Sequence, residues 1–171
     1  MIPFIGELIT ASSAPELIAG ILLLLGGAMF AVCAVALGFI DLTEHRLPNR
    51  IIYPWAAVTA GILVIVAALL GDLPGLLRGF GAALLWGLLF LVVRLVHPPS
   101  LGMGDVKLAV VLGLYTGFLG WVTVAAAVLL SFILAGVVAI ILLLSRRADR
   151  RTRIPFGPFL LVGTALALII S

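Results

Sequence analysis

Long apolar stretches make up most of this sequence, and they leave few folds open to it. A helix needs about 20 apolar residues to cross the hydrocarbon core of a bilayer, and residues 51–70 and 76–96 each provide such a run. Of 171 residues, 64% are hydrophobic and 10% are charged, whereas about 25% are charged in soluble domains. We therefore expect an all-α, polytopic membrane helix bundle that forms a single domain over residues 1–171.

The apolar stretches predict about six transmembrane helices. Residues 108–144 are almost continuously apolar and too long for one span, so we place a break in TGFLGW, at residues 116–121, which contains two glycines and an interfacial tryptophan. The first run is longer than the apolar core of a signal peptide and no Lys or Arg precedes it, so we expect it to be retained. The expected helices are residues 15–40, 51–70, 76–96, 105–117, 121–144 and 154–170.

Basic residues gather in the first, third and fifth connections between these helices. Because Lys and Arg are enriched in cytoplasmic loops, this distribution places those connections in the cytoplasm and both termini outside. No long basic face with interleaved aromatic residues is present, so no nucleic-acid partner is expected. The arginines of the fifth connection indicate a topology anchor or, alternatively, a site for acidic substrate or lipid headgroups; they are Arg146, Arg147, Arg150, Arg151 and Arg153.

Two aspartates interrupt the apolar pattern on the same side of this topology. Asp41 follows the first apolar run, in ALGFIDLTEHRLPNR, and Asp105 begins the fourth, in SLGMGDVKLAVVLG. Ionisable residues at membrane depth usually face the bundle interior and mark function. Asp105 alone could be a helix N-cap, and a neighbouring Arg46 or His45 could account for Asp41 near the negative end of a helix. Their shared side of the membrane favours a functional pair.

Two adjacent carboxylates share a proton and thereby provide a general base and a general acid in one site. The base activates a water for attack on a peptide carbonyl, and the acid protonates the leaving amine. We assign the base to Asp105, at the positive end of its helix, and the acid to Asp41. Gly102 and Gly104 would give an extended peptide access to the pair. This mechanism requires no metal ion and no cofactor.

Three sequence blocks resemble motifs of the type IV prepilin peptidases. GMGD at residues 102–105, followed by VKL, is similar to the family's GxGD signature. DLTEHRLPNR, which includes Pro48 and Asn49, resembles its first aspartate motif, and RIPFGPFLLVG at residues 153–163 resembles its last-helix motif. The resemblance covers the chain from about Phe30 onward, with the blocks in the family's order and spacing.

The resemblance implies a membrane-embedded aspartic endopeptidase in which Asp41 and Asp105 are the catalytic pair. It implies an active site at the cytoplasmic face of the inner membrane of a prokaryote. The substrate would be a prepilin or pseudopilin of a type IV pilus, Flp pilus or secretion system, with a short basic leader before a hydrophobic helix. That helix would lie in the lipid bilayer against the bundle.

The resemblance is incomplete at the N-terminus. Larger members carry a cytoplasmic domain with paired Cys-x-x-Cys motifs, which is associated with methylation of the new N-terminus. Here some 14 residues precede the first expected helix and Cys33 is the single cysteine. We therefore expect neither N-methyltransferase activity nor a zinc site. This short form resembles single-activity peptidases, such as those of tight-adherence pili, and archaeal preflagellin peptidases.

Several residues near the motifs have two interpretations. Lys107 could tune Asp105 or hold a substrate group, or it could be an ordinary lysine extending to the membrane surface. Pro48 and Asn49 are expected to end the turn of the first loop. GLLRG and GLYTG, at residues 75–79 and 113–117, indicate close helix packing. Two other classes of function stay open: a proton-coupled membrane carrier and a structural subunit of a secretion complex.

Overall fold

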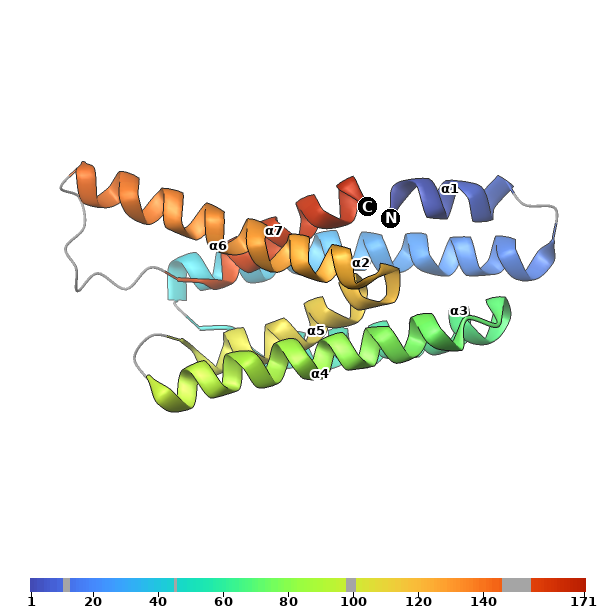
Figure 1. Cartoon of the computed structure of the whole chain (residues 1–171), viewed down its shortest axis with the longest axis horizontal. Coiled ribbons are helices and arrows are strands. Elements are labelled where there is room, and N and C mark those ends of the chain that lie inside the picture. Colours follow the sequence, from blue (N-terminus) through green and yellow to red (C-terminus); the bar gives the residue numbers. More distant parts are fainter. Residues whose placement is uncertain (11–12, 45, 98–100, 146–154) are drawn as a thin grey trace.

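The computed structural model describes the whole chain except residues 11–12, 45, 98–100 and 146–154. The regular structure of the described residues is entirely helical, as expected (Figure 1). Its seven helices are α1 (Ile2–Thr10), α2 (Ala14–Glu44), α3 (Asn49–Leu70), α4 (Leu73–Val96), α5 (Met103–Leu119), α6 (Trp121–Leu144) and α7 (Gly157–Ile170).

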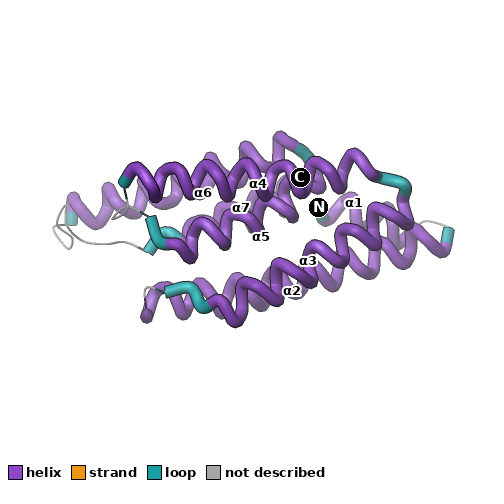
Figure 2. The backbone as a smooth tube through the Cα atoms, turned by 90° about the horizontal axis from the view of Figure 1, so that it is seen from below, coloured by secondary structure: helices purple, strands orange, loops and turns teal. Residues whose placement is uncertain are grey.

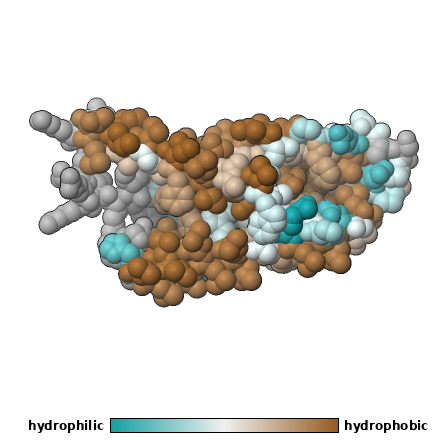
Figure 3. Space-filling view, in the orientation of Figure 1, coloured by the Kyte–Doolittle hydropathy of each residue, from teal (hydrophilic) through white to brown (hydrophobic). Residues whose placement is uncertain are grey.

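The helices lie along one long axis and form two layers, with α2 and α3 in one layer and α4 to α7 in the other (Figure 2). Four of them, α2, α3, α4 and α6, are long and apolar enough to cross a bilayer by themselves. The face shown in Figure 3 is covered mainly by hydrophobic residues, with small hydrophilic areas between them. Because water would penalise so much exposed apolar surface, this is the exterior of a membrane protein.

The six expected helices correspond to α2 through α7, and α6 has the predicted bounds. The predicted break before α6 is confirmed at Gly120, whose φ of 152° and ψ of 161° are accessible essentially only to glycine. Helix α2 continues to Glu44, so Asp41 lies inside its last turn instead of after its end. Helix α7 begins at Gly157, three residues later than expected.

Helix α1 was not predicted, because nine residues are too few for a membrane span. It packs against the first half of α2, where Leu8 and Ile9 contact Gly20. The chain's first residue meets the end of α7, and the backbone nitrogen of Met1 donates to the carbonyl of Leu168 (3.0 Å). Helices α7 and α1 therefore follow one another along α2 (Figure 1). Together their 23 residues (14 + 9) have about the length of one span.

Helices α4 and α5 form the closest helix pair, and glycines make this contact possible. A Cβ atom on Gly113 of α5 would lie 2.5 Å from the Cα atom of Ala83 on α4. A Cβ atom on Gly117 would lie 2.7 Å from the carbonyl oxygen of Arg78. The prediction that residues 113–117 serve close helix packing is confirmed. We call this contact the α4–α5 seam.

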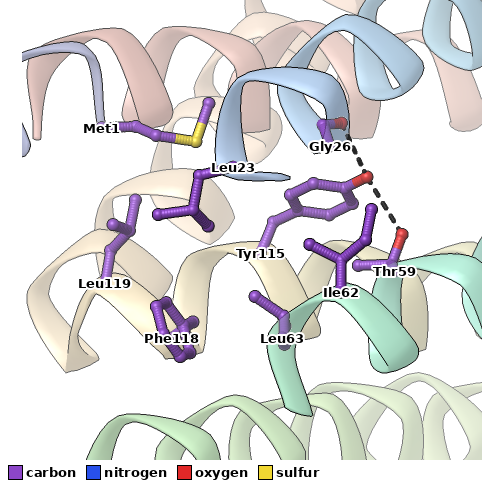
Figure 4. Close-up of a pocket in the computed structure, with 9 residues that line it drawn as sticks. All are labelled: Met1, Leu23, Gly26, Thr59, Ile62, Leu63, Tyr115, Phe118 and Leu119. Carbon is purple, nitrogen blue, oxygen red and sulfur yellow. Dashed lines mark hydrogen bonds between the residues drawn. The ribbon is translucent and has the colours of Figure 1, made fainter. Parts of the chain in front are cut away.

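A buried tyrosine ties α5 to the other layer (Figure 4). The hydroxyl of Tyr115 accepts hydrogen bonds from Trp55 Nε1 (3.1 Å) and Thr59 Oγ1 (3.0 Å), both on α3, and donates to the carbonyl of Gly26 on α2 (3.0 Å). The ring of Phe30 packs edge-on against those of Trp55 and Tyr115. Because polar groups at this depth have no water to bind, the Tyr115 network fixes α5 relative to α2 and α3.

Candidate functional site

The two aspartates lie at the same end of the bundle, where α2 ends and α5 begins (Figure 1). Asp41 is 5% exposed and Asp105 is 7% exposed, and they are the two buried acidic residues in the described part of the chain. The carboxyl groups of Asp41 and Asp105 lie close enough to interact electrostatically. The structure therefore brings together two side chains that are 64 positions apart (105 − 41) in sequence. This proximity argues against the structural-subunit alternative, in which the aspartates had no reason to meet.

Asp105 is held by the backbone of its own glycine-rich segment. Its Oδ2 atom accepts a hydrogen bond from the N–H of Gly102 at 3.0 Å. Gly102 is the N-cap of α5, and Asp105 stands three positions later. The alternative that Asp105 is itself the N-cap is therefore wrong: its side chain reaches back to the cap residue, as the acidic residue of a capping box does.

Two glycines from different helices close the site around Asp41 and Leu47. A Cβ atom on Gly157, the first residue of α7, would lie 2.5 Å from Oδ2 of Asp41. A Cβ atom on Gly104 would lie 2.7 Å from the Cβ atom of Leu47. Leu47 also lies next to Gly157, so this side chain lies between the starts of α5 and α7. Any larger residue at either glycine position would displace the carboxylate or Leu47.

The sequence did not predict that Gly157 belongs to the site, although Gly157 lies in the RIPFGPFLLVG block at residues 153–163. The available signal was a glycine between Pro155 and Pro158 at the beginning of an apolar stretch. Pro158 occupies the first turn of α7, where proline is tolerated. What the sequence does not show is that this turn meets α2 at Asp41.

Arg94 is a second residue that the sequence did not single out for the site. It lies in the last turn of α4, and its Nη1 atom donates to the carbonyl oxygen of Leu101 at 2.7 Å. Leu101 directly precedes Gly102, and the positive charge of Arg94 also acts on Asp105. Arg94 therefore connects the end of α4 to the segment that holds Asp105.

Lys107 and Asn49 are brought together, but away from the carboxylate pair. The Nζ atom of Lys107 donates to Oδ1 of Asn49 at 2.8 Å, on the exposed surface, and lies 5.0 Å from the centre of the Tyr53 ring. Pro48 is the N-cap of α3 and Asn49 is its first residue, so both belong to the beginning of that helix. This exposed position is consistent with the interpretation of Lys107 as an ordinary lysine extending to the membrane surface, and its bond to Asn49 also connects α5 to the start of α3.

The described residues contain no cluster of three potential metal ligands. His45 and the five arginines of the fifth connection lie outside the described residues. The chemistry that the described site offers is therefore that of two neighbouring carboxyl groups, supported by the backbone N–H of Gly102 and by Arg94. Two buried carboxyl groups at one end of an apolar helix bundle place the protein among polytopic membrane proteins with ionisable residues inside the bundle.

Comparison with known proteins specifies this class further. The sequence profile of the type IV leader peptidase family matches residues 28–140, a range that contains both aspartates. The chain belongs to this family. Because the match covers 113 of 171 residues (140 − 28 + 1), it extends over most of α2 to α6.

Several curated proteins resemble the chain at about 30% identity. The prepilin leader peptidase/N-methyltransferase of Pseudomonas aeruginosa is 31% identical over 137 residues, which cover 79% of this chain and 46% of that protein. The protein of the same name from Aeromonas hydrophila is 32% identical, with the same coverage. That of Burkholderia pseudomallei is 31% identical over 145 residues, 82% of this chain and 45% of the relative. The chain thus matches about half the length of these relatives. No solved structure matches it.

Proposed function

We propose that this protein is a membrane-embedded aspartic endopeptidase that removes the leader from prepilin-like precursors at the cytoplasmic face of the membrane. The observation that carries the proposal is the burial of Asp41 and Asp105 next to each other at one end of the bundle. Membership of the type IV leader peptidase family and the names of the relatives support the choice of substrate. The proposal concerns the peptidase activity alone, because the matching profile is that of the leader peptidases.

The chemistry follows from the shared proton of a carboxyl pair. Burial and mutual repulsion disfavour two negative charges, so one member is neutral in the resting enzyme. We assign the charged state to Asp105, because its Oδ2 atom accepts the N–H of Gly102 at the positive end of α5 and the guanidinium of Arg94 binds the carbonyl of the adjacent Leu101. Asp41, in the last turn of α2, lies at the negative end of that helix and is the protonated member.

The proposed reaction adds one water across the scissile amide. Asp105 takes a proton from the water while the water oxygen bonds to the carbonyl carbon. At the same time Asp41 donates its proton to the carbonyl oxygen. When the tetrahedral intermediate collapses, the carbon–nitrogen bond breaks and the leaving nitrogen takes the proton from Asp105. The hydroxyl proton returns to Asp41, so both carboxyl groups end in their initial states.

Cleavage of a prepilin in membranes or detergent tests this proposal. The wild type is compared with Asp41→Asn and Asp105→Asn, and with Glu7→Gln as a control on exposed α1. General acid–base groups typically contribute 10²- to 10⁴-fold, so each aspartate variant is expected to lose about that factor while Glu7→Gln keeps wild-type cleavage. Cleavage that persists in both aspartate variants would contradict the mechanism, and a wild type that cleaves no prepilin would contradict the function.

A further inference from the structure

An open groove runs along the outside of the bundle between α2 and α7. Its volume is about 650 Å³. The side chains that line it come from α2, from α7 and from the first two residues of the chain, and none of them carries a charge or a hydrogen-bonding group. The described lining of the groove is therefore almost entirely apolar, within the membrane-facing part of the protein.

Beside the larger Phe30, Val35, Phe39 and Leu42, the α2 side of this groove contains a row of small residues, Gly27, Ala31, Ala34 and Gly38. Their spacing of four, three and four positions places them on one helix face, which extends over about 17 Å. Rows of this kind let membrane helices approach closely. An acyl chain packs against any apolar surface, so it would not require such a row.

Among the described residues, the glycines of this row make only loose contacts. A Cβ atom on Gly38 would meet only Cδ1 of Leu161, at 3.9 Å, and one on Gly27 only Cε of Met1, at 3.4 Å. In the α4–α5 seam the corresponding atoms would collide with the backbone at 2.5–2.7 Å. The glycines of α2 therefore leave space in which another helix could pack closely.

One end of the groove lies at the candidate active site. Phe39 and Leu42, which line it, flank Asp41 in sequence, and Pro158 on the opposite wall directly follows Gly157. Gly157 is the residue whose backbone packs against the Asp41 carboxylate. A helix lying in the groove would therefore end within about one helical turn of Asp41.

We propose that the α2–α7 groove binds the apolar helix of the precursor, so that the peptide segment just beyond its end reaches Asp41 and Asp105. This inference rests on the proposed function for the identity of the substrate. The row of small residues selects a helix over lipid, and the uncharged walls select an apolar one. Specificity would then come in part from helix packing in the membrane, separately from recognition of the leader.

Site-specific photo-cross-linking tests the location of the helix without depending on catalysis. A benzoylphenylalanine is placed at Val162, which lines the groove and is 50% exposed, and in a control at Leu89 on α4, which is 51% exposed. Both are combined with Asp41→Asn and a prepilin is added in membranes. We expect cross-links to the prepilin from Val162 at least fivefold above those from Leu89. Equal cross-linking at both positions, or none at Val162, would overturn the proposal.

Filling the groove tests its role in cleavage. Ala34→Leu places a larger side chain in the groove, and Ala57→Leu makes the same change on the exposed surface of α3. We expect Ala34→Leu to raise KM for a full-length prepilin about tenfold with little change in kcat. It should leave cleavage of a soluble peptide that ends before the apolar helix unchanged, as should Ala57→Leu for both substrates. An unchanged KM for the prepilin would contradict the proposal that the groove binds the apolar helix of the precursor.

The two proposals fail in different ways. If the wild type cleaves neither substrate but Val162 cross-links the prepilin selectively, the groove is a docking surface and the peptidase function is wrong. If cleavage depends on both aspartates while cross-linking is unselective, the peptidase function holds and the groove proposal is wrong.

Discussion

The α4–α5 seam and the α2–α7 groove both contain rows of small residues, but the seam is closely packed and the groove is open. In the seam, glycines on one helix lie against the backbone of the other, so that no further atom fits. In the groove, the glycines and alanines of α2 face open space and the nearest side-chain atoms of α7. The seam lies against α5, most of whose residues are buried, and the groove is on the outside of the bundle. Small residues in a membrane helix therefore allow another helix to pack closely, but they do not show whether a helix of the same chain does so.

The largest expected effect is at the seam, where we compare Gly117→Ala with Gly38→Ala in the groove. The added methyl group at Gly117 would lie 2.5 Å from Cβ of Ala82 and against the backbone of Arg78, so the two helices must separate. We expect a loss of about 3 kcal/mol in unfolding free energy, at the upper end of typical overpacking costs. Gly38→Ala, which meets ordinary contact distances, should change stability by less than about 0.5 kcal/mol. Thermal or denaturant unfolding in detergent measures both, and equal destabilisation would remove the distinction between the two regions.

The second prediction concerns a glycine that packs against a functional group instead of a helix. Gly157→Ala would push the Asp41 carboxylate away from its position. Because displacement by about 1 Å can cost 10²-fold in rate, we expect prepilin cleavage to fall about 100-fold while the fold is retained. Gly136→Ala on α6, where no atom lies within 4 Å of the new Cβ, is the matched control and should keep its activity. Normal cleavage by Gly157→Ala would show that this contact does not position Asp41.

A smaller effect is expected for the hydrogen bonds of Tyr115, which join α5 to α2 and α3. Tyr115→Phe removes the hydroxyl that accepts from Trp55 and Thr59 and leaves both donors buried. Hydrogen bonds between membrane helices contribute about 0.6–2 kcal/mol, so the unfolding free energy should fall by about that amount. Tyr53→Phe, on the exposed side of α3, keeps the ring beside Lys107 and should have no measurable effect. If both variants were equally stable, the network would contribute nothing to holding α5 in place.

The smallest effect is expected at Lys107. Its hydrogen bond to Asn49 is exposed, and exposed polar pairs contribute at most a few tenths of a kcal/mol. We expect Lys107→Gln to change prepilin cleavage less than threefold and to leave stability unchanged. A loss comparable to that of the aspartate variants would instead place Lys107 in the catalytic machinery.

Hydropathy predicted most of the fold, because each long apolar run must become a helix in a bilayer. It gave the bounds of α6 and the break at Gly120, and it identified Asp41 and Asp105 as exceptions to the pattern. It missed α1, because nine residues provide too little apolar length for a span and their burial depends on the neighbouring α2. It did not identify Gly102 as the N-cap of α5, because a glycine has no side chain to signal that position.

The remaining parts of the site depend on contacts between segments distant in sequence. Gly157 and Arg94 carry no local sign of their neighbours, since Gly157 meets Asp41 across more than 100 positions and Arg94 acts through the Leu101 carbonyl. Lys107 was equally consistent with two roles until its bond to Asn49 on another helix was located. Side-chain partners across helices are set by helix rotation and depth, which composition does not encode.

The sequence by itself determined that this protein is a helical membrane bundle with two acidic residues among its apolar helices, because both conclusions follow from the cost of placing polar groups in hydrocarbon. Only the tertiary structure shows that the two acids lie together. It also shows that the glycines of α5 pack against α4 in the α4–α5 seam, whereas those of α2 face an open groove that ends near Asp41. The physical reason is that helix packing depends on which faces meet, and the same small residue can bring two helices into contact or leave room for a third.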